Sequence, residues 1–181
     1  MARGLLLIDI QNDYFAGGAM TLSGIEQAAD NAAAVLATFR ATGEPVFHVQ
    51  HVSVRSGAGF MLPGTPGVEI NERVLPAPGE SLTRKHYPNA FRDTELATTL
   101  REAGVDNLVI VGAMSHMCID ASTRAAFDLG FTCHVVSDAC ATRDLNHGGR
   151  SVAAADVHAA FMAALGGVYA NLVASRDIIG S

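Results

Sequence analysis

Short apolar runs rich in Val, Ile and Leu recur along the 181-residue chain and alternate with longer Ala-rich segments. Such runs are typical of strands buried on both faces of a sheet. The predicted strands cover residues 4–10, 45–52, 81–86, 107–112, 131–137 and 171–174. Helical spacing is found at residues 24–42, 94–103, 117–129 and 150–165. The alternation predicts an α/β fold with a parallel sheet between helices, and the length fits a single domain spanning residues 1–181.

Residues 53–79 interrupt this alternation. The segment holds four of the six prolines and five glycines, and its apolar residues follow no clear period. Long irregular loops inside a compact domain commonly cover a binding or catalytic site. We therefore expect this loop to cover a site and to carry much of its specificity.

The composition narrows the classes of partner. The net charge is −6 and no run of Lys or Arg occurs, which argues against nucleic acid or an anionic membrane surface as a partner. No apolar run is long enough to span a membrane or to form the core of a signal peptide, so we expect a cytoplasmic location. Only 17% of the residues are charged, and the helical segment 150–165 is rich in Ala. These features favour burial between subunits, as a homodimer or homotetramer.

Two opposite charges stand at the ends of predicted strands. Ligands of an open parallel sheet bind beyond the carboxyl ends of its strands, which is where Asp9 and Lys85 stand. Asp9 follows four aliphatic residues and needs a partner if it is buried. Lys85 is the only lysine of the chain, against eleven arginines. The pair is either a buried structural ion pair or part of a reactive site.

Cys118 follows the next strand, where the predicted helix 117–129 begins. The first turn of a helix favours a thiolate and also binds an oxyanion. With a carboxylate and an ammonium nearby, Cys118 is a candidate nucleophile. A single cysteine is otherwise a small apolar core residue, which is our interpretation of Cys133 and Cys140. The three cysteines form no Cys-x-x-Cys pair, so neither a disulfide framework nor a thiolate zinc site is predicted.

The sequence gives little support for a cofactor. His48 and His51 are spaced i, i+3 in a predicted strand, which places them on opposite faces of the sheet, and no acidic residue lies near them in sequence. We interpret both as core or site-lining residues and expect no metal. No glycine pattern for binding nucleotide phosphates is present, so no nucleotide cofactor is expected.

Three motifs together resemble the isochorismatase-like cysteine hydrolases, a superfamily that includes nicotinamidases, N-carbamoyl amidohydrolases, streptothricin hydrolase and isochorismatases. The motifs are Asp-x-Gln-x-Asp-Tyr at residues 9–14, Lys85 followed by Pro-Asn-Ala-Phe at residues 88–91, and the segment 111–118 that ends in Cys118. The loop motif at residues 63–67 fits the same superfamily. The resemblance covers nearly the whole chain. It implies a Rossmann-like three-layer α/β/α sandwich with a six-stranded parallel sheet.

The resemblance also implies a catalytic triad of Cys118, Asp9 and Lys85. In such enzymes the thiolate attacks an amide carbonyl, the carboxylate transfers the proton and the ammonium stabilises both. The backbone N–H groups of Met114 and Cys118 would form the oxyanion hole, next to a cis peptide bond between Ala113 and Met114. The side chains expected to line the substrate pocket are Tyr14, Phe91, His116 and Met117.

Departures from individual families narrow the expected reaction. Nicotinamidases carry a metal-binding Asp-x-His element where residues 49–53 read Val-Gln-His-Val-Ser, so nicotinamide is not the expected substrate. Isochorismatases proper lack the nucleophilic cysteine. We therefore expect hydrolysis of a C–N bond in a small amide, lactam or carbamoyl compound. The alternatives are vinyl-ether hydrolysis with Asp9 as the acid, and a catalytically silent binding or assembly protein on the same fold.

Overall fold

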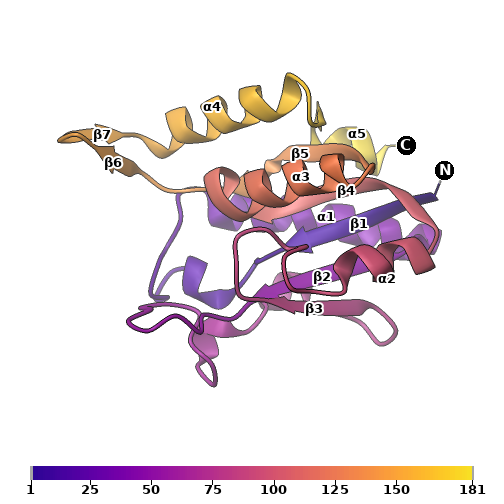
Figure 1. Ribbon diagram of the computed structural model, residues 1–181, viewed down its shortest axis with the longest axis horizontal. Helices are drawn as coiled ribbons and strands as arrows, with labels where there is room; N and C mark the ends of the chain where they lie inside the picture. Colours follow the sequence, from indigo (N-terminus) through magenta and orange to yellow (C-terminus); the bar gives the residue numbers. More distant parts are fainter. Residues whose placement is uncertain (1, 181) are drawn as a thin grey trace.

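A six-stranded parallel sheet with helices on both faces forms the body of the molecule (Figure 1). The computed structural model describes residues 2–180. The strand order is β3-β2-β1-β4-β5-β8. The strands are β1 (Ala2–Ile8), β2 (Val46–His51), β3 (Ser81–Lys85), β4 (Val105–Ala113), β5 (Thr132–Ala141) and β8 (Asn171–Val173). The predicted three-layer α/β/α sandwich is confirmed.

Five helices flank this sheet in two layers. They are α1 (Ile25–Thr42), α2 (Leu96–Glu102), α3 (Asp120–Asp128), α4 (Ala154–Gly166) and α5 (Ser175–Ile179). Buried side chains of α1 and α5 pack with one face of the sheet, and those of α2, α3 and α4 pack with the other. Successive residues of β1 contribute to opposite cores: Leu5 and Leu7 to the first, Leu6 and Ile8 to the second. This double coverage explains the continuous apolar runs in the sequence.

The predicted helix at residues 150–165 was wrong over its first turn. Arg150–Val152 forms strand β7, which pairs antiparallel with β6 (Leu145–His147). Gly148 and Gly149 connect the two strands and both have positive φ, 57° and 76°, the backbone that a tight two-residue hairpin turn requires. The hairpin projects beyond the rest of the molecule at the end where α4 begins (Figure 1).

The sheet has its topological switch point between β1 and β4. From β1 the chain builds outward through β2 and β3, and from β4 it builds in the opposite direction through β5 and β8. Connections therefore diverge at the carboxyl ends of β1 and β4 and leave a crevice there, which is where ligands bind in such sheets. None of the helices within residues 2–180 is long and apolar enough to cross a membrane.

Candidate active site

The structure brings Asp9, Lys85 and Cys118 together at the carboxyl ends of three strands. Asp9 directly follows β1, Lys85 is the last residue of β3, and Cys118 lies in a single π-helical turn (Ser115–Ile119) after β4. Lys85 Nζ lies 2.7 Å from Asp9 Oδ2 and donates a hydrogen bond of 3.2 Å to Cys118 Sγ. Asp9 and Lys85 are fully buried, and Cys118 is 5% exposed.

The backbone at the end of β1 is shaped to present the Asp9 carboxylate. Asp9 has a φ of 54°, in the left-handed region that Asp tolerates better than most residues. The preceding residue, Ile8, pairs with Gly112 of β4, which has a φ of 133° and where a Cβ would lie 1.9 Å from the carbonyl oxygen of Ile8. Only glycine therefore allows β4 to pass this close to β1. The Asp9 turn depends on that close approach at the switch point.

The Asp9 carboxylate is held by charge and has few other partners. Its contact with Lys85 is an ion pair, and neither oxygen accepts a well-aligned hydrogen bond from residues 2–180. Buried carboxylates are usually saturated with hydrogen bonds, since leaving an acceptor unpaired costs free energy. Lys85 is thus the main partner of the Asp9 carboxylate.

Lys85 is oriented by a set of acceptors around its ammonium. Besides Cys118, Nζ donates to the carbonyl oxygen of Tyr87 (3.1 Å) and to His51 Nδ1 (3.2 Å). Burial lowers the pKa of Lys85, but the Asp9 charge and the close contacts with Asp9 and Cys118 outweigh it, so the net pKa is raised. Lys85 therefore remains an ammonium at neutral pH.

His51 is a site residue whose contact with Lys85 was not predicted. Burial and the Lys85 charge lower the pKa of His51 to about 4, so the ring is neutral at pH 7. An ammonium only donates, so Nδ1 is the acceptor and the proton lies on Nε2. His51 and Lys85 are register partners across β2 and β3. Their positions at the ends of two predicted strands were the only signal of this contact in the sequence.

Cys118 departs from the expected thiolate. Burial raises the pKa of its thiol, and the Asp9 carboxylate raises it further, against a smaller lowering by Lys85. The regular helix α3 begins only at Asp120, so Cys118 lies before its first turn. The resting thiol is therefore neutral, and it becomes a thiolate only as a base removes its proton.

The segment before Cys118 is fixed by several hydrogen bonds. The Ala113–Met114 peptide bond is cis, as the resemblance predicted. The carbonyl oxygen of Met114 accepts from the N–H groups of Met117 (3.0 Å) and Ile119 (3.2 Å), whereas the Met114 N–H has no backbone acceptor within residues 2–180. A rigid turn with an unused N–H beside a thiol is suited to bind a carbonyl oxygen that gains negative charge.

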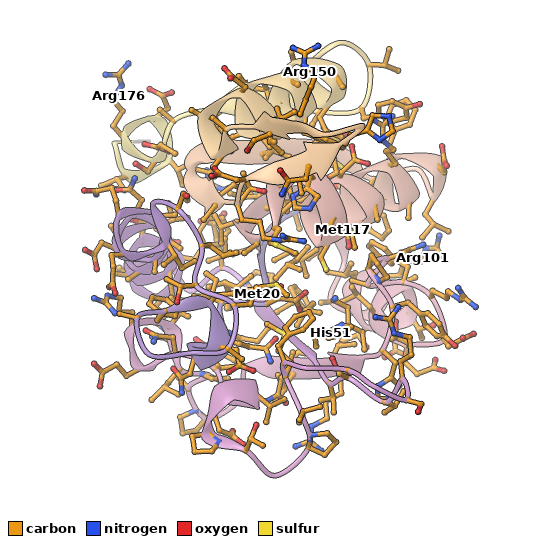
Figure 2. The ribbon with its side chains drawn as sticks, turned by 90° about the vertical axis from the view of Figure 1, so that its left-hand side faces the viewer. Met20, His51, Arg101, Met117, Arg150 and Arg176 are labelled. Carbon is orange, nitrogen blue, oxygen red and sulfur yellow. The ribbon has the colours of Figure 1, made fainter. Side chains whose placement is uncertain are left out.

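A cavity of about 510 Å³ opens in front of Cys118. That volume suits a small organic ligand. Of the four predicted pocket residues, Tyr14 and Met117 line the cavity, together with His51 and Phe60. Figure 2 looks onto this end of the sheet, with His51 and Met117 near the middle of the face. The remaining lining residues are Ser53, Val54, Arg55, Ala58, His86, Tyr87, Pro88 and Met114.

Phe91 and His116 lie outside the lining of this cavity, which corrects the prediction. Phe91 packs into the core, where its ring stacks on Phe131 at 6.1 Å. His116 Nδ1 forms a 2.6 Å hydrogen bond with Thr142 Oγ1, and its ring packs edge-on against Phe161. Both residues belong to the motifs, but their side chains point into packing contacts rather than into the cavity.

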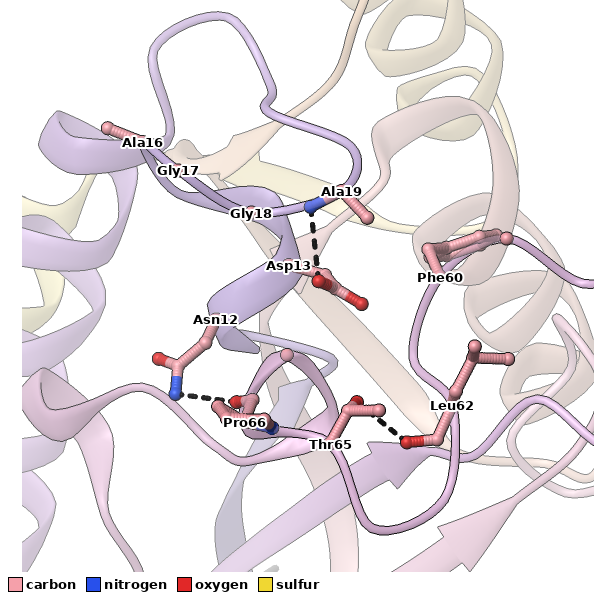
Figure 3. A pocket seen from close by; sticks show the side chains of 12 residues that line it. Asn12, Asp13, Ala16, Gly17, Gly18, Ala19, Phe60, Leu62, Thr65 and Pro66 are labelled. Atoms are coloured by element: carbon pink, nitrogen blue, oxygen red, sulfur yellow. Dashed lines mark hydrogen bonds between the residues drawn. The ribbon is translucent and has the colours of Figure 1, made fainter.

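A second hollow of about 590 Å³ lies beside the turn at Asn12–Tyr14, and Figure 3 shows it close up. Its one acidic side chain, Asp13, accepts hydrogen bonds from the N–H groups of Ala19 (3.1 Å) and Met61. A Cβ at Gly67 would lie 2.0 Å from Asp13 Oδ1. Asp13 therefore holds the loop at residues 53–79 against the turn at Asn12–Tyr14. Because Asp13 has this structural role, we place the candidate chemistry in the cavity at Cys118.

Gln11, the middle residue of the first motif, has a similar structural role. Its side-chain amide donates to the carbonyl oxygens of Val68 (2.6 Å) and His51 (2.8 Å), and its oxygen accepts from the His51 N–H (2.8 Å). These bonds join the end of β2 to the loop at residues 53–79. Gln11 and Asp13 thus hold the loop in place over the site.

His48, Cys133 and Cys140 lie away from the cavity at Cys118. His48 is buried on the other face of β2 and its Nε2 lies 2.8 Å from Glu80 Oε2. Within residues 2–180, no three His, Cys, Asp or Glu side chains are grouped so that they could hold a metal ion. Cys133 and Cys140 are buried, unpaired residues.

Comparison with known proteins identifies the family. Residues 3–166 match the Isochorismatase domain. An uncharacterised isochorismatase family protein from Bacillus subtilis is 54% identical over 172 residues, which cover 95% of this chain and 96% of the relative. A crystal structure assigned to the isochorismatase hydrolases, from Oleispira antarctica, shares 50% identity and a TM-score of 0.96, covering 99% of this chain and 97% of that one.

The chain therefore belongs to the isochorismatase family of hydrolases, as its motifs predicted. A more distant relative is a maleamate amidohydrolase from Pseudomonas putida, 30% identical over 96% of this chain and 83% of the relative. The family thus includes an enzyme that hydrolyses an amide.

Proposed function

We propose that this protein is a cysteine hydrolase that cleaves the C–N bond of a small amide, lactam or carbamoyl compound. The observation that carries the proposal is the meeting of the Cys118 thiol, the Asp9 carboxylate and the Lys85 ammonium in one buried cluster. Cys118 also lines the cavity, so a ligand has access to the sulfur. The amidohydrolase among the relatives supports the same reaction class.

In the first step, Cys118 Sγ attacks the amide carbonyl carbon while Asp9 takes the thiol proton. The raised pKa of the thiol makes this coupled transfer necessary, because little free thiolate exists at neutral pH. The negative charge moves from Asp9 to the carbonyl oxygen, where the N–H groups of Met114 and Cys118 would receive it. Lys85 stays charged throughout and stabilises the sulfur as it loses its proton.

In the second step, the tetrahedral intermediate collapses and its C–N bond breaks. Asp9 gives its proton to the departing nitrogen, which leaves as ammonia or an amine and leaves a thioester on Cys118. A water molecule then attacks the thioester while Asp9 takes its proton. Asp9 returns that proton to sulfur as the C–S bond breaks, and the carboxylic acid product leaves.

The test is ammonia release from a panel of small amides, combined with mass spectrometry of acid-quenched enzyme. The wild-type protein is expected to release ammonia and to carry an acyl group on Cys118. Cys118→Ala and Cys118→Ser should lose turnover by about 10⁴-fold or more while remaining folded. Cys133→Ala is the matched control, because its thiol is buried away from the cavity and its loss should leave turnover intact.

Three outcomes would contradict the proposal. Full amide turnover by Cys118→Ala would exclude the nucleophile. Isochorismate hydrolysis by that variant, without amide turnover in the wild type, would indicate the vinyl-ether reaction. A wild-type protein that neither releases ammonia nor alkylates at Cys118 faster than at Cys140 would indicate a binding or assembly protein.

A further inference from the structure

The side chains that line the Cys118 cavity include a cation and no carboxylate. The lining contains no Asp or Glu, and its one permanently charged side chain is Arg55, on the loop after β2. His51 also lines the cavity, but its lowered pKa keeps it neutral. The buried Asp9 carboxylate is balanced by Lys85. Among the lining side chains, a ligand therefore meets a permanent cation and no anion.

Arg55 differs from most arginines of the molecule because its side chain has no partner among residues 2–180. Eight of the eleven arginines have a polar or charged partner within residues 2–180: Arg3, Arg40, Arg73, Arg84, Arg92, Arg101, Arg124 and Arg176. Arg55 donates no side-chain hydrogen bond and forms no ion pair with the described residues. Its guanidinium fork is thus free to bind two oxygens of a ligand.

A second arginine whose side chain has no partner among the described residues adds positive charge near the site. Arg143 follows β5, and its charge acts on two groups here, opposing the rise in the pKa of Tyr14 and lowering the pKa of His116. The protein as a whole carries a net charge of −6. A local concentration of positive charge on an acidic protein favours capture of an anion at that place.

The walls near these charges are apolar. Tyr14, Val54, Phe60 and Met117 line the cavity that holds the Cys118 sulfur and also reaches Arg55. A ligand with its amide at Cys118 and a charged group at Arg55 would place a short hydrocarbon segment against these side chains. Burial of that segment contributes to binding, and the two polar ends fix its direction.

We propose that the amide substrate carries a carboxylate, and that Arg55 is the residue that binds it and determines this specificity. The inference rests on the proposed amide hydrolysis. It narrows the substrate class to small amides with an acidic group separated from the scissile bond by a short apolar spacer. Neutral and cationic amides of the same size are then poor substrates.

The test compares three amides of similar size: succinamate, which is anionic, butyramide, which is neutral, and 3-aminopropanamide, which is cationic. For the wild-type protein, kcat/KM should be about 10- to 100-fold higher for succinamate than for butyramide, the effect of one charge-assisted pair, and lowest for the cation. Arg55→Ala should bring the ratio of succinamate to butyramide close to one, chiefly through KM, and Arg55→Lys should restore part of it. High salt should reduce the wild-type ratio.

Arg176→Ala is the matched control. Arg176 is exposed, lies far from His51 and Met117 in Figure 2, and should keep both the rates and the ratio of the wild type. A wild-type preference for butyramide or for the cation would overturn the inference. An unchanged ratio in Arg55→Ala would do the same.

A binding measurement separates this inference from the proposed reaction. Calorimetry on Cys118→Ala should show succinamate binding more tightly than butyramide, and the difference should vanish in Cys118→Ala/Arg55→Ala. If no amide is hydrolysed but this difference is present, the hydrolase proposal fails and the anion site stands. If amides are hydrolysed and succinamate binds no better than butyramide, the anion site fails alone.

Discussion

Two carboxylates at opposite ends of β3 are each paired with a basic residue, yet their surroundings differ. Glu80, just before β3, accepts hydrogen bonds from Arg40 at both oxygens (2.7 and 2.8 Å), from the Ala77 N–H (2.8 Å) and from His48 Nε2 (2.8 Å). Asp9, beside the far end of β3, has the Lys85 ion pair and no well-aligned hydrogen bond from the described residues. One carboxylate is saturated with donors and the other is not.

Under the proposed function, this difference separates a structural cluster from a reactive one. The hydrogen bonds from Arg40, together with those from Ala77 and His48, outweigh burial and lower the pKa of Glu80 to about 2. Protonating Glu80 would break several contacts at once, so it is a poor proton acceptor. Asp9 can take a proton while Lys85 keeps its bonds to Tyr87 and His51. The number of donors around each carboxylate, rather than residue type, distinguishes the two.

Replacing each carboxylate by its amide should give the largest difference between the two clusters. Asp9→Asn should lower kcat/KM for amide hydrolysis by about 10⁴-fold, because the amide cannot accept the thiol proton. Glu80→Gln should keep the activity of the folded protein and instead lower the free energy of unfolding by about 1–3 kcal/mol. Amide kinetics and urea titrations on both variants provide the measurement. Comparable losses of activity in the two variants would remove the distinction.

Asp9, Lys85 and Cys118 were predictable from sequence because a parallel sheet brings the carboxyl ends of its strands to one edge. Each residue ends or follows an apolar run that was recognisable without a structure. The parallel sheet and its double coverage by helices followed from the same alternation and the family motifs, whereas the strand order came only from the structure. These predictions depend on local pattern and topology, so an error of one or two residues in the predicted end of a strand or helix does not change them.

Other parts of the site depend on distances between segments that no local pattern encodes. The contact of His51 with Lys85 requires the register of β2 against β3. Arg55 reaches the cavity only through the path of an irregular loop. Phe91 and His116 stand close in sequence to motif residues but pack against Phe131 and Phe161. The sequence indicates which strand ends and loops carry these residues, but it does not show where their side chains point.

The buried ion pair itself should be strongly coupled. Lys85→Met leaves the Asp9 charge buried and unpaired, and it should lower the free energy of unfolding by about 3–5 kcal/mol. The double variant Asp9→Asn/Lys85→Met removes both charges and should be less destabilised than Lys85→Met alone. Urea unfolding of the two singles and the double gives the coupling free energy. Strictly additive losses would mean that the two charges do not interact.

The smallest expected difference is between the two histidines of β2, His51 and His48, in how each makes stability depend on pH. Burial lowers the pKa of both, but the Lys85 charge lowers it further at His51, whereas the hydrogen bond and the charge of Glu80 partly offset the effect at His48. The Asp9 charge opposes the shift at His51 and is the weaker influence there.

A histidine with a pKa of about 4 in the folded protein and the usual 6.5 when unfolded binds protons less readily in the folded state. Its contribution to stability is therefore fully present above pH 6.5 and is lost as the pH falls toward 4.

His51→Asn keeps an oxygen that can accept a hydrogen bond from Lys85 but does not titrate. It should lose less stability than the wild type between pH 7 and pH 5, by about 2 kcal/mol. His48→Asn should reduce this loss of stability by less, because the Glu80 carboxylate beside His48 partly offsets the lowering of its pKa. Urea titrations at both pH values decide the order, and a larger effect at His48 would mean that the neighbouring cation does not control His51.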